Sequence, residues 1–377
     1  MHRPAAPTRL RPAGLFLALT CAVASAVAAT PATKPAAGDT YAMSDFTRVR
    51  KYDAHVHINV DDPAFLQEAR EANFELMTIN VDYPDFPPIA LQRTIAEHQH
   101  DADPARVHWA ATFSMKGFGT PGWEKQVEAS LRRDVAEGAT AVKVWKNVGM
   151  VEKDAHGKLI MLDNPGLSPV AEQVRALDVA FIGHQGEPHN CWLPLEQMTT
   201  DNDREYFGKH PQYHMYLHPD QPSYDDQMAA RDRFVAAHPK LRFVGAHMAS
   251  LEYDVDRLAA FLDRFPNASV DLAARMGQVQ YQSVRDREKV RNFFIRYQDR
   301  LLYGTDLTYS PDGTAEEFKR SADEVWRSDW RYLATGESQR IDTVKADVAG
   351  LALPRGVIDK IYYRNAVREF AAPSSRR

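Results

Sequence analysis

The chain is poor in cysteine and has no excess of basic residues. Only two of its 377 residues are cysteine, which excludes a disulfide-rich scaffold. Its 46 Lys and Arg stand against 51 Asp and Glu, so it lacks the basic field that attracts phosphate backbones, and we expect no nucleic-acid partner. The remaining composition, 44% hydrophobic and 26% charged, is that of a globular protein and excludes disorder, collagen and coiled coil.

The motifs of several common enzyme classes are also missing. There is no Gly-x-Ser-x-Gly nucleophile elbow and no phosphate-binding P-loop. Residues 117–122 spell Gly-x-Gly-x-x-Gly, but Pro121 interrupts them and they do not follow the first strand, so we do not interpret them as a dinucleotide site. The chain does have 14 histidines, whose imidazoles bind metals and transfer protons near neutral pH.

A single long apolar run extends from Ala13 to Ala29, after three arginines, and ends in small residues at alternate positions. This pattern predicts a secretory signal peptide over residues 1–29 and a protein that is exported, either periplasmic or secreted, and free of the membrane once the signal is cleaved. A retained anchor is the alternative, because the run is near the lower length limit for spanning a bilayer.

Cleavage of the signal would change the mature chain in two ways. Cys191 would be left as its only cysteine, so no intramolecular disulfide would form. The net charge would fall from −5 to −8, because the signal holds three arginines and no acid. Residues 30–48 begin with a stretch rich in Ala, Thr and Pro and predict a flexible linker. We assign residues 49–372 to one catalytic domain.

Short runs rich in β-branched and aromatic residues alternate with longer amphipathic stretches from residue 49 onward. This alternation is typical of repeated βα units. One of the amphipathic stretches, 123–137, predicts a helix with Thr120 as its N-cap and Gly138 just past its end. Eight strands are predicted, at 51–57, 74–81, 107–114, 140–146, 178–184, 242–248, 268–273 and 300–306. Eight such units favour an α/β fold of the (β/α)8 TIM-barrel type, and an open doubly wound sheet is the alternative.

The connection between the fifth and sixth predicted strands, residues 187–241, is much longer than the others. It is rich in aromatic residues and histidine. Long loops at the C-terminal face of such barrels shape the active site, so we expect this insertion to form a lid or a substrate wall. A packing insertion or a subunit contact in a homo-oligomer is the alternative.

Five metal-binding side chains stand at ends of predicted strands. His55 and His57 are separated by one residue, so alternation along the first strand sends both to the same face. His184, His247 and Asp306 close the fifth, sixth and eighth predicted strands. In a parallel barrel these ends form one ring, so the five side chains would face a common space. Burying them without partners is costly, and the sequence therefore predicts a metal site.

This set, in strand order, resembles the amidohydrolase superfamily over essentially the whole mature chain. The closing stretch, residues 353–366, is similar to the branch that includes aminocarboxymuconate semialdehyde decarboxylase. The resemblance implies one divalent metal, zinc in the first place and manganese as the alternative. It also implies that His247 is the acid/base, and that Asp306 accepts a proton besides binding the metal. The implied ligands are His55, His57, His184 and Asp306.

A lysine on the fourth predicted strand leaves the number of metals open. Binuclear members of the superfamily carry a carboxylated lysine there, and either Lys143 or Lys146 occupies that place. We favour one metal, with the lysine paired to an acidic neighbour or to a substrate carboxylate. The residues near the mouth that are candidates for binding substrate are Trp145, Asn147, Glu187, Trp192, Asp271 and Arg275.

Three functions are consistent with these patterns. The first is an exported metal-dependent hydrolase that uses a metal-activated water on an amide, ester or lactone of a small molecule. The second is a metal-dependent decarboxylase or hydratase of a small carboxylic acid, which the closing stretch favours. The third is a binding protein that retains the metal without turnover.

Overall fold

The computed structural model describes residues 39–372. The predicted signal peptide and the first part of the predicted linker, up to residue 38, lie outside the described residues. The rest of the linker packs on the domain, because Thr40 forms a β-bridge with Pro354 and Phe46 is fully buried. The packed domain therefore starts before residue 49, where the sequence placed its beginning.

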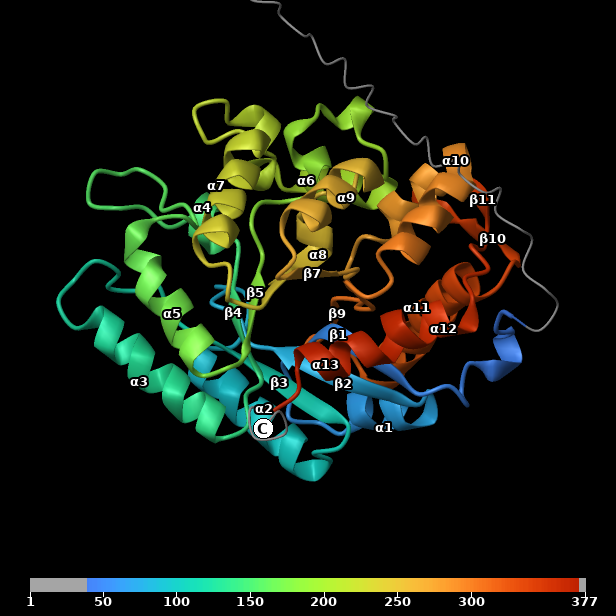
Figure 1. The fold of residues 1–377 in the computed structure, drawn as a ribbon, viewed down its shortest axis with the longest axis horizontal. Helices are drawn as coiled ribbons and strands as arrows, with labels where there is room; N and C mark the ends of the chain where they lie inside the picture. Colours follow the sequence, from blue (N-terminus) through green and yellow to red (C-terminus); the bar gives the residue numbers. More distant parts are fainter. Residues whose placement is uncertain (1–38, 373–377) are drawn as a thin grey trace, which may run out of the picture. The chain divides into compact units, whose positions relative to one another are not determined.

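Nine short parallel strands form one sheet in the order β8-β7-β6-β5-β4-β3-β2-β1-β9 (Figure 1). All eight predicted strands are present, most of them shorter than expected. The nine observed strands are β1 (Lys51–Ile58), β2 (Phe74–Ile79), β3 (Val107–Thr112), β4 (Ala141–Val144), β5 (Ala180–Gly183), β6 (Phe243–Gly245), β7 (Ala268–Asp271), β8 (Leu301–Leu302) and β9 (Leu307–Tyr309).

The sheet closes on itself at its eighth position. β8 and β9 are two parts of the eighth predicted strand, separated by residues 303–306. β8 pairs with β7 and β9 pairs with β1. Between these pairings, Ala54 N donates to Tyr303 O and Asp306 N donates to His55 O. The (β/α)8 barrel is therefore confirmed, and the sheet is not open.

A helix follows each strand position on the outside of the barrel (Figure 1). These helices are α1 (Ala64–Glu71), α2 (Ile89–Ala102), α3 (Trp123–Ala136), α5 (Ser168–Ala176), α7 (Tyr224–Ala237), α9 (Val255–Arg264), α10 (Met276–Arg296) and α11 (Ala315–Ala334). Further elements are α4 (Asn147–Met150), α6 (Asp201–Lys209), α8 (Ala246–Ala249), β10 (Ser338–Ile341), β11 (Ala346–Ala349), α12 (Arg355–Asp359) and α13 (Asn365–Glu369). Within residues 39–372, no helix has the length and apolar character needed to cross a bilayer.

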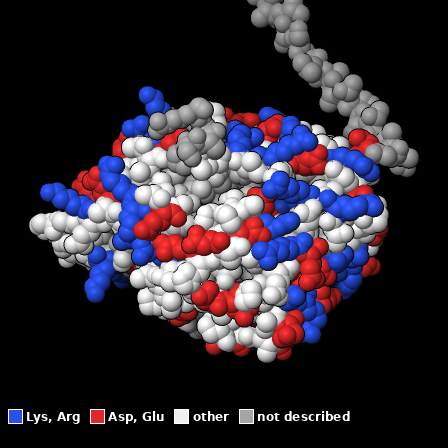
Figure 2. Space-filling model, turned by 90° about the horizontal axis from the view of Figure 1, so that it is seen from below, with Lys and Arg blue, Asp and Glu red and all other residues white. Residues whose placement is uncertain are grey.

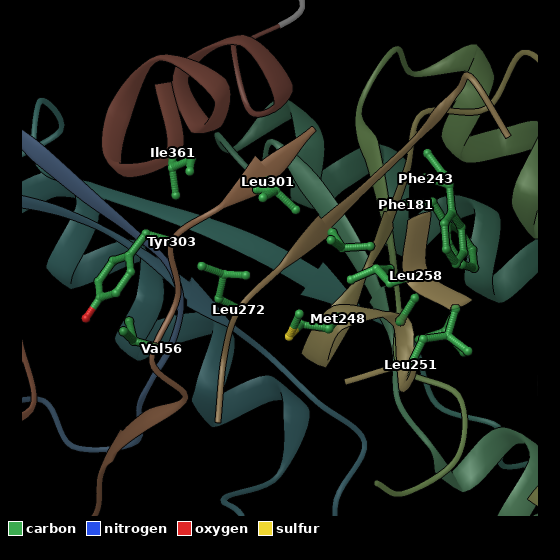
Figure 3. Packing of buried hydrophobic residues seen from close by; sticks show 14 of the residues in the cluster. Val56, Phe181, Phe243, Met248, Leu251, Leu258, Leu272, Leu301, Tyr303 and Ile361 are labelled. Atoms are coloured by element: carbon green, nitrogen blue, oxygen red, sulfur yellow. The ribbon is translucent and has the colours of Figure 1, made fainter. Parts of the chain in front are cut away.

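Two apolar layers hold the barrel together. The outer layer lies between strands and helices, where the Phe181 and Phe243 rings stack 6.0 Å apart and Leu258 of α9 packs nearby (Figure 3). The inner layer fills the barrel with smaller side chains, including Ala141 and Ala180. Burial of each large side chain in the outer layer stabilises the fold by about 1.5–3 kcal/mol. The polar groups described below lie above the inner layer, where the strands end.

The surface carries charges of both signs. Acidic and basic side chains lie interspersed on the face shown in Figure 2. Several of them form pairs one helical turn apart, such as Arg132 with Glu128 on α3. Exposed pairs of this kind contribute little to stability, at most about 1 kcal/mol each.

The insertion after β5 forms a small body with its own core. Residues 187–223 contain α6 and four single-turn helices, and Cys191, Met198, Phe207 and Met215 are buried together there. Burial raises the pKa of the Cys191 thiol. The insertion then continues into α7, which packs on the barrel like the other outer helices.

Candidate metal centre

An irregularity in β1 places both of its histidines at the barrel mouth. Tyr52 and Ala54 belong to the apolar cluster inside the barrel. The register of β1 against β2 then shifts between Asp53 and Val56. Such a bulge moves the side-chain alternation by one residue, so His55 follows Ala54 on the inner side and His57 follows His55. Both histidines are buried.

The predicted side chains converge on one cavity, which we call the inner cavity. Its volume is about 150 Å³. The polar residues that line it are His55, His57, Lys143, Lys146, His184, His247, Asp306 and Thr308, and the apolar or aromatic ones are Val81, Tyr83, Phe86 and Trp145. All five strand-end residues predicted from the sequence are in this set.

His55, His57 and Asp306 form one close group, and His55, His247 and Asp271 form another. In the first group, one potential ligand atom from each residue lies within 4.8 Å of the other two. Asp306 Oδ1 is 3.4 Å from His55 Nε2 and 3.2 Å from His57 Nε2. His184, the fourth predicted ligand, lines the same cavity but stands outside this group.

The hydrogen bond of His57 fixes which of its nitrogens faces the cavity as an acceptor. His57 Nδ1 is 2.7 Å from Ile79 O, and a carbonyl oxygen only accepts, so Nδ1 carries the proton. In the neutral ring, Nε2 then presents a lone pair toward Asp306. Histidines that bind a metal through one ring nitrogen typically donate a hydrogen bond from the other ring nitrogen in this way.

His55 has the same arrangement with a carboxylate in place of a carbonyl. His55 Nδ1 is 2.8 Å from Asp271 Oδ2, and both side chains are almost completely buried. Burial and the charge of Lys143 lower the pKa of His55, although Asp271 acts in the opposite direction. Its Nε2 lone pair therefore faces the cavity. Asp271, a candidate substrate-binding residue in the sequence, is held by His55 and by backbone N–H groups.

His247 stands two residues past the end of β6, so the sixth strand is shorter than predicted. It begins a run of four residues with left-handed backbone, with φ between 54° and 57°. Tertiary hydrogen bonds hold this run, including His247 N to Asp271 Oδ1 at 2.7 Å and Ser250 Oγ to Gln185 O at 2.8 Å. Non-glycine residues adopt this conformation at a cost of about 1–2 kcal/mol each, and such strain concentrates at functional sites.

A hydrogen bond on the side away from the cavity orients the imidazole of His247. Its Nδ1 donates to Ala273 O at 2.9 Å, which leaves the Nε2 lone pair on the cavity side. Its ring centroid lies 4.2 Å from that of His184 and 4.7 Å from that of His55. Burial, together with His184 and Arg275, holds the pKa of His247 well below its usual value. His247 is therefore a neutral base at neutral pH.

His184 directly follows β5. It is buried, and its Nε2 has no hydrogen-bond partner among the described residues. Burial and the charges of Lys143 and Lys146 hold its pKa well below the usual value. Leaving a buried polar atom unpaired costs about 1–3 kcal/mol, so this nitrogen points to a ligand.

Asp306 lies in the break between β8 and β9 with left-handed backbone at φ 69°. The preceding turn is tied to β1, because Asp53 accepts hydrogen bonds from Thr305 N and Thr305 Oγ1. Gly304 permits the close approach, since a Cβ there would lie 3.1 Å from His55 Cβ. Desolvation raises the pKa of Asp306, but its close contacts with His57 and His55 and the charge of Lys143 outweigh this effect and lower that pKa.

The two candidate lysines have different surroundings. Lys143 alternates with Ala141 on β4, points into the barrel and places Nζ 3.4 Å from His55 Nε2. Burial lowers its pKa to about 8, and within residues 39–372 it forms no ion pair. Lys146, by contrast, forms an ion pair with Glu187. Of the two, Lys143 therefore has the position from which a metal could be bridged.

This donor set fits a divalent metal ion. Three potential ligand atoms, His55 Nε2, His57 Nε2 and Asp306 Oδ1, face one another, and a cation between them would be bound by all three. Imidazole nitrogens combined with a carboxylate suit zinc, and manganese accepts the same ligands.

A second, larger cavity adjoins the first, and we call it the outer cavity. Its volume is about 320 Å³. Trp145, Asn147 and Glu187 line it, as expected for substrate-binding candidates, whereas Trp192 and Arg275 line neither cavity. The residues that line it are Asp82, Tyr83, Pro84, Trp145, Lys146, Asn147, Met150, Val151, Glu152, Glu187, Tyr206, Gln212, Tyr213 and Met215.

The insertion supplies part of this wall, through Tyr206, Gln212, Tyr213 and Met215, which agrees with its predicted role. Sequence reasoning missed Asp82 and Tyr83, which line the same cavity. Their position just after the second predicted strand is the signal that identifies them, because strand C-terminal ends meet at the mouth.

Comparisons with known proteins identify a family and a related fold. A family model described as amidohydrolase matches residues 52–371. No curated protein sequence matches the chain. An uncharacterized TIM-barrel protein from Bordetella bronchiseptica has a similar structure, with a TM-score of 0.52 and 13% identity over 86% of this chain and 99% of that one.

Two further solved structures are more distant. The 4-oxalomesaconate hydratase of Rhodopseudomonas palustris aligns with a TM-score of 0.44 and 13% identity, over 84% of each chain. The 5-carboxyvanillate decarboxylase of Novosphingobium aromaticivorans aligns with a TM-score of 0.43 and 12% identity, over 82% of this chain and 81% of that one.

Proposed function

Because the chain belongs to the amidohydrolase family of metal-dependent enzymes, we propose that it is a hydrolase that cleaves an amide, ester or lactone of a small molecule with an activated water. The observation behind the proposal is the convergence of His55 Nε2 and His57 Nε2 on Asp306 Oδ1. Export, which the N-terminal apolar run favours, is part of the proposal, since it suits the degradation of external compounds.

The proposed ligands of one divalent ion are His55, His57, His184 and Asp306. When bound with an open position, such an ion supplies Lewis acidity and lowers the pKa of a coordinated water to about 7. Zinc is the first expectation and manganese the alternative. A second ion next to Lys143 is the alternative for the metal count, because its Nζ is buried 3.4 Å from His55 Nε2 and forms no ion pair within residues 39–372.

The chain's own residues would move the proton. His247 Nε2 accepts it from the attacking water as the new carbon–oxygen bond forms, since Nδ1 is committed to Ala273 O. The imidazolium then donates it to the leaving nitrogen or oxygen as that bond breaks. Asp306 offers a second acceptor for the water proton. Asp271 positions both His55 and the backbone of His247, so that these groups keep their orientation during the reaction.

A decarboxylase or hydratase is the second candidate. The similarity of residues 353–366 to the decarboxylase branch favours it. The same inner cavity would serve, with His247 Nε2 first taking a proton from water and then delivering it to the carbon from which carbon dioxide leaves. A binding protein that keeps its metal without turnover is the third possibility.

Product analysis separates these functions. The metal-loaded protein would be incubated in ¹⁸O-labelled water with panels of esters, amides, lactones and small carboxylic acids. The proposal expects an acid product that carries one ¹⁸O, and loss of that product in His247→Gln. Release of carbon dioxide, or addition of water across a double bond, would instead establish the second candidate. No turnover of any panel member with the ion bound would favour the third.

A further inference from the structure

The outer cavity has a composition that the proposed reaction does not require. Its walls carry four aromatic rings, from Tyr83, Trp145, Tyr206 and Tyr213. Two of them, Tyr83 and Trp145, stand with ring centroids 4.5 Å apart. Since hydrolysis takes place in the inner cavity, these rings are available for the part of the substrate that does not react.

The outer cavity adjoins the inner one. Tyr83, Trp145 and Lys146 line both, so a molecule bound in the outer cavity lies next to the candidate metal centre. We therefore treat the two cavities as one substrate site, in which the inner cavity takes the bond that reacts and the outer cavity binds the rest of the substrate.

Negative charge prevails in the outer cavity. Three carboxylates line it, from Asp82, Glu152 and Glu187, against one ammonium group, from Lys146. Lys146 is paired with Glu187. Asp82 and Glu152 form no ion pair in the described part of the chain, and both accept from the amide of Asn147, at 3.5 Å and 3.3 Å. Two carboxylates therefore remain without a cation beside aromatic rings.

We propose that the outer cavity binds an amine-bearing aromatic group, so that the substrate is a cationic aryl or arylalkyl amine whose scissile bond reaches the inner cavity. Aromatic faces attract an ammonium group through the ring quadrupole, and the two carboxylates add to this attraction. An anionic group would meet the same carboxylates at close range. This inference rests on the proposed function only in assigning the chemistry to the inner cavity.

The volume limits the size of the group. At about 320 Å³, the outer cavity is at the lower end of ligand sites in proteins, about 300–1,000 Å³. One aromatic ring with a short aminoalkyl arm fits this space. Extended peptides and polysaccharides do not.

Calorimetric titration with three probes of the same size tests the inference. Benzylamine is cationic at pH 7, benzyl alcohol is neutral and benzoate is anionic. The full chain would be titrated with its metal bound and again after chelation. We expect benzylamine to bind about tenfold more tightly than benzyl alcohol, and benzoate to bind most weakly to the chelated protein. Equal binding of benzylamine and benzyl alcohol, or tightest binding of benzoate to the chelated protein, would overturn the inference.

Substitutions locate the binding. Glu152→Gln keeps the shape of the side chain and removes one charge, so benzylamine affinity should fall about fivefold while benzyl alcohol affinity stays the same. Asp82→Asn should act likewise. Glu196→Gln is the matched control, because this exposed acid of the insertion lies outside the cavity and should leave both affinities unchanged. An equal loss in Glu196→Gln, or no loss in Glu152→Gln and Asp82→Asn, would contradict the placement.

These titrations need no turnover. If the probes bind as expected but no substrate is hydrolysed, the proposed function fails while the cavity assignment stands. If a hydrolysed substrate is found and the probes show no preference for the cation, the cavity assignment fails alone.

Discussion

His55 Nδ1 lies 2.8 Å from Asp271 Oδ2, and the other oxygen of the same carboxylate accepts a hydrogen bond from His247 N at 2.7 Å. One buried aspartate on β7 therefore orients a candidate metal ligand from β1 and the candidate acid/base after β6. Residues that act behind a ligand in this way set its tautomer and direction.

Replacing this aspartate should weaken metal binding without unfolding the protein. In Asp271→Asn the amide holds His55 less strongly, so the metal dissociation constant should rise about 10- to 100-fold. Competitive titration with a chromogenic chelator measures it, and a thermal melt checks folding. Asp225→Asn, an exposed acid on α7, should leave the constant unchanged. An unchanged metal dissociation constant in Asp271→Asn would show that Asp271 does not position the ligand His55.

His247→Gln should separate proton transfer from metal binding. Without the imidazole, kcat should fall by about 10² to 10⁴, because general acid–base catalysis contributes that much. The metal content per chain should stay at the wild-type value, since this residue is not one of the proposed ligands. Elemental analysis beside steady-state kinetics checks both. Loss of the metal together with activity would make His247 a ligand instead.

Lys143→Gln tests the number of metal ions. With one ion held by His55, His57, His184 and Asp306, the variant should keep about one equivalent, as the wild type does. Elemental analysis of both proteins decides this. Two equivalents in the wild type and one in the variant would show that the lysine bridges a second ion.

A buried carboxylate outside the site should make stability depend on pH. Asp329 of α11 is fully enclosed and accepts from Tyr303 OH at 2.9 Å. Burial raises its pKa to about 7, above the value of about 3.9 in an unfolded chain. The folded state therefore binds the Asp329 proton more tightly than the unfolded state does. The contribution of this proton to the free energy of unfolding is full below about pH 4 and is lost as the pH rises through about 7.

Denaturant unfolding of the chelated protein at pH 5 and pH 8 measures this contribution. The free energy of unfolding should decline less between these values in Asp329→Asn than in the wild type. Glu316 is an exposed acid at the start of the same helix, so the free energy of unfolding of Glu316→Gln should decline as that of the wild type does. Identical declines in all three proteins would show that Asp329 ionises normally in the fold.

Much of the barrel was predictable, because parallel strands buried on both sides are rich in β-branched and apolar residues. All eight strand positions and the strand-end residues follow from this pattern. The local backbone geometry at the metal centre does not follow from the sequence pattern. The bulge after Asp53 and the left-handed run from His247 depend on tertiary hydrogen bonds that no local pattern encodes.

The start of α3 is a smaller example. Thr120 was the predicted N-cap, but the helix begins after Gly122, whose φ of 96° suits glycine. Gly138 does stand just past the helix end, as predicted, and the structure gives it a positive φ. The outer cavity shows the same limit on a larger scale, since Tyr83 and Tyr213 are far apart in sequence and meet only through the folding of the insertion.

Metal removal and restoration tests the central claim most directly. The purified protein would be analysed for bound metal, chelated, and reloaded with zinc or manganese while turnover of a cleaved substrate is followed. The account predicts about one divalent ion per chain, loss of turnover on chelation and its return on reloading. Full turnover after complete removal of the metal would contradict it.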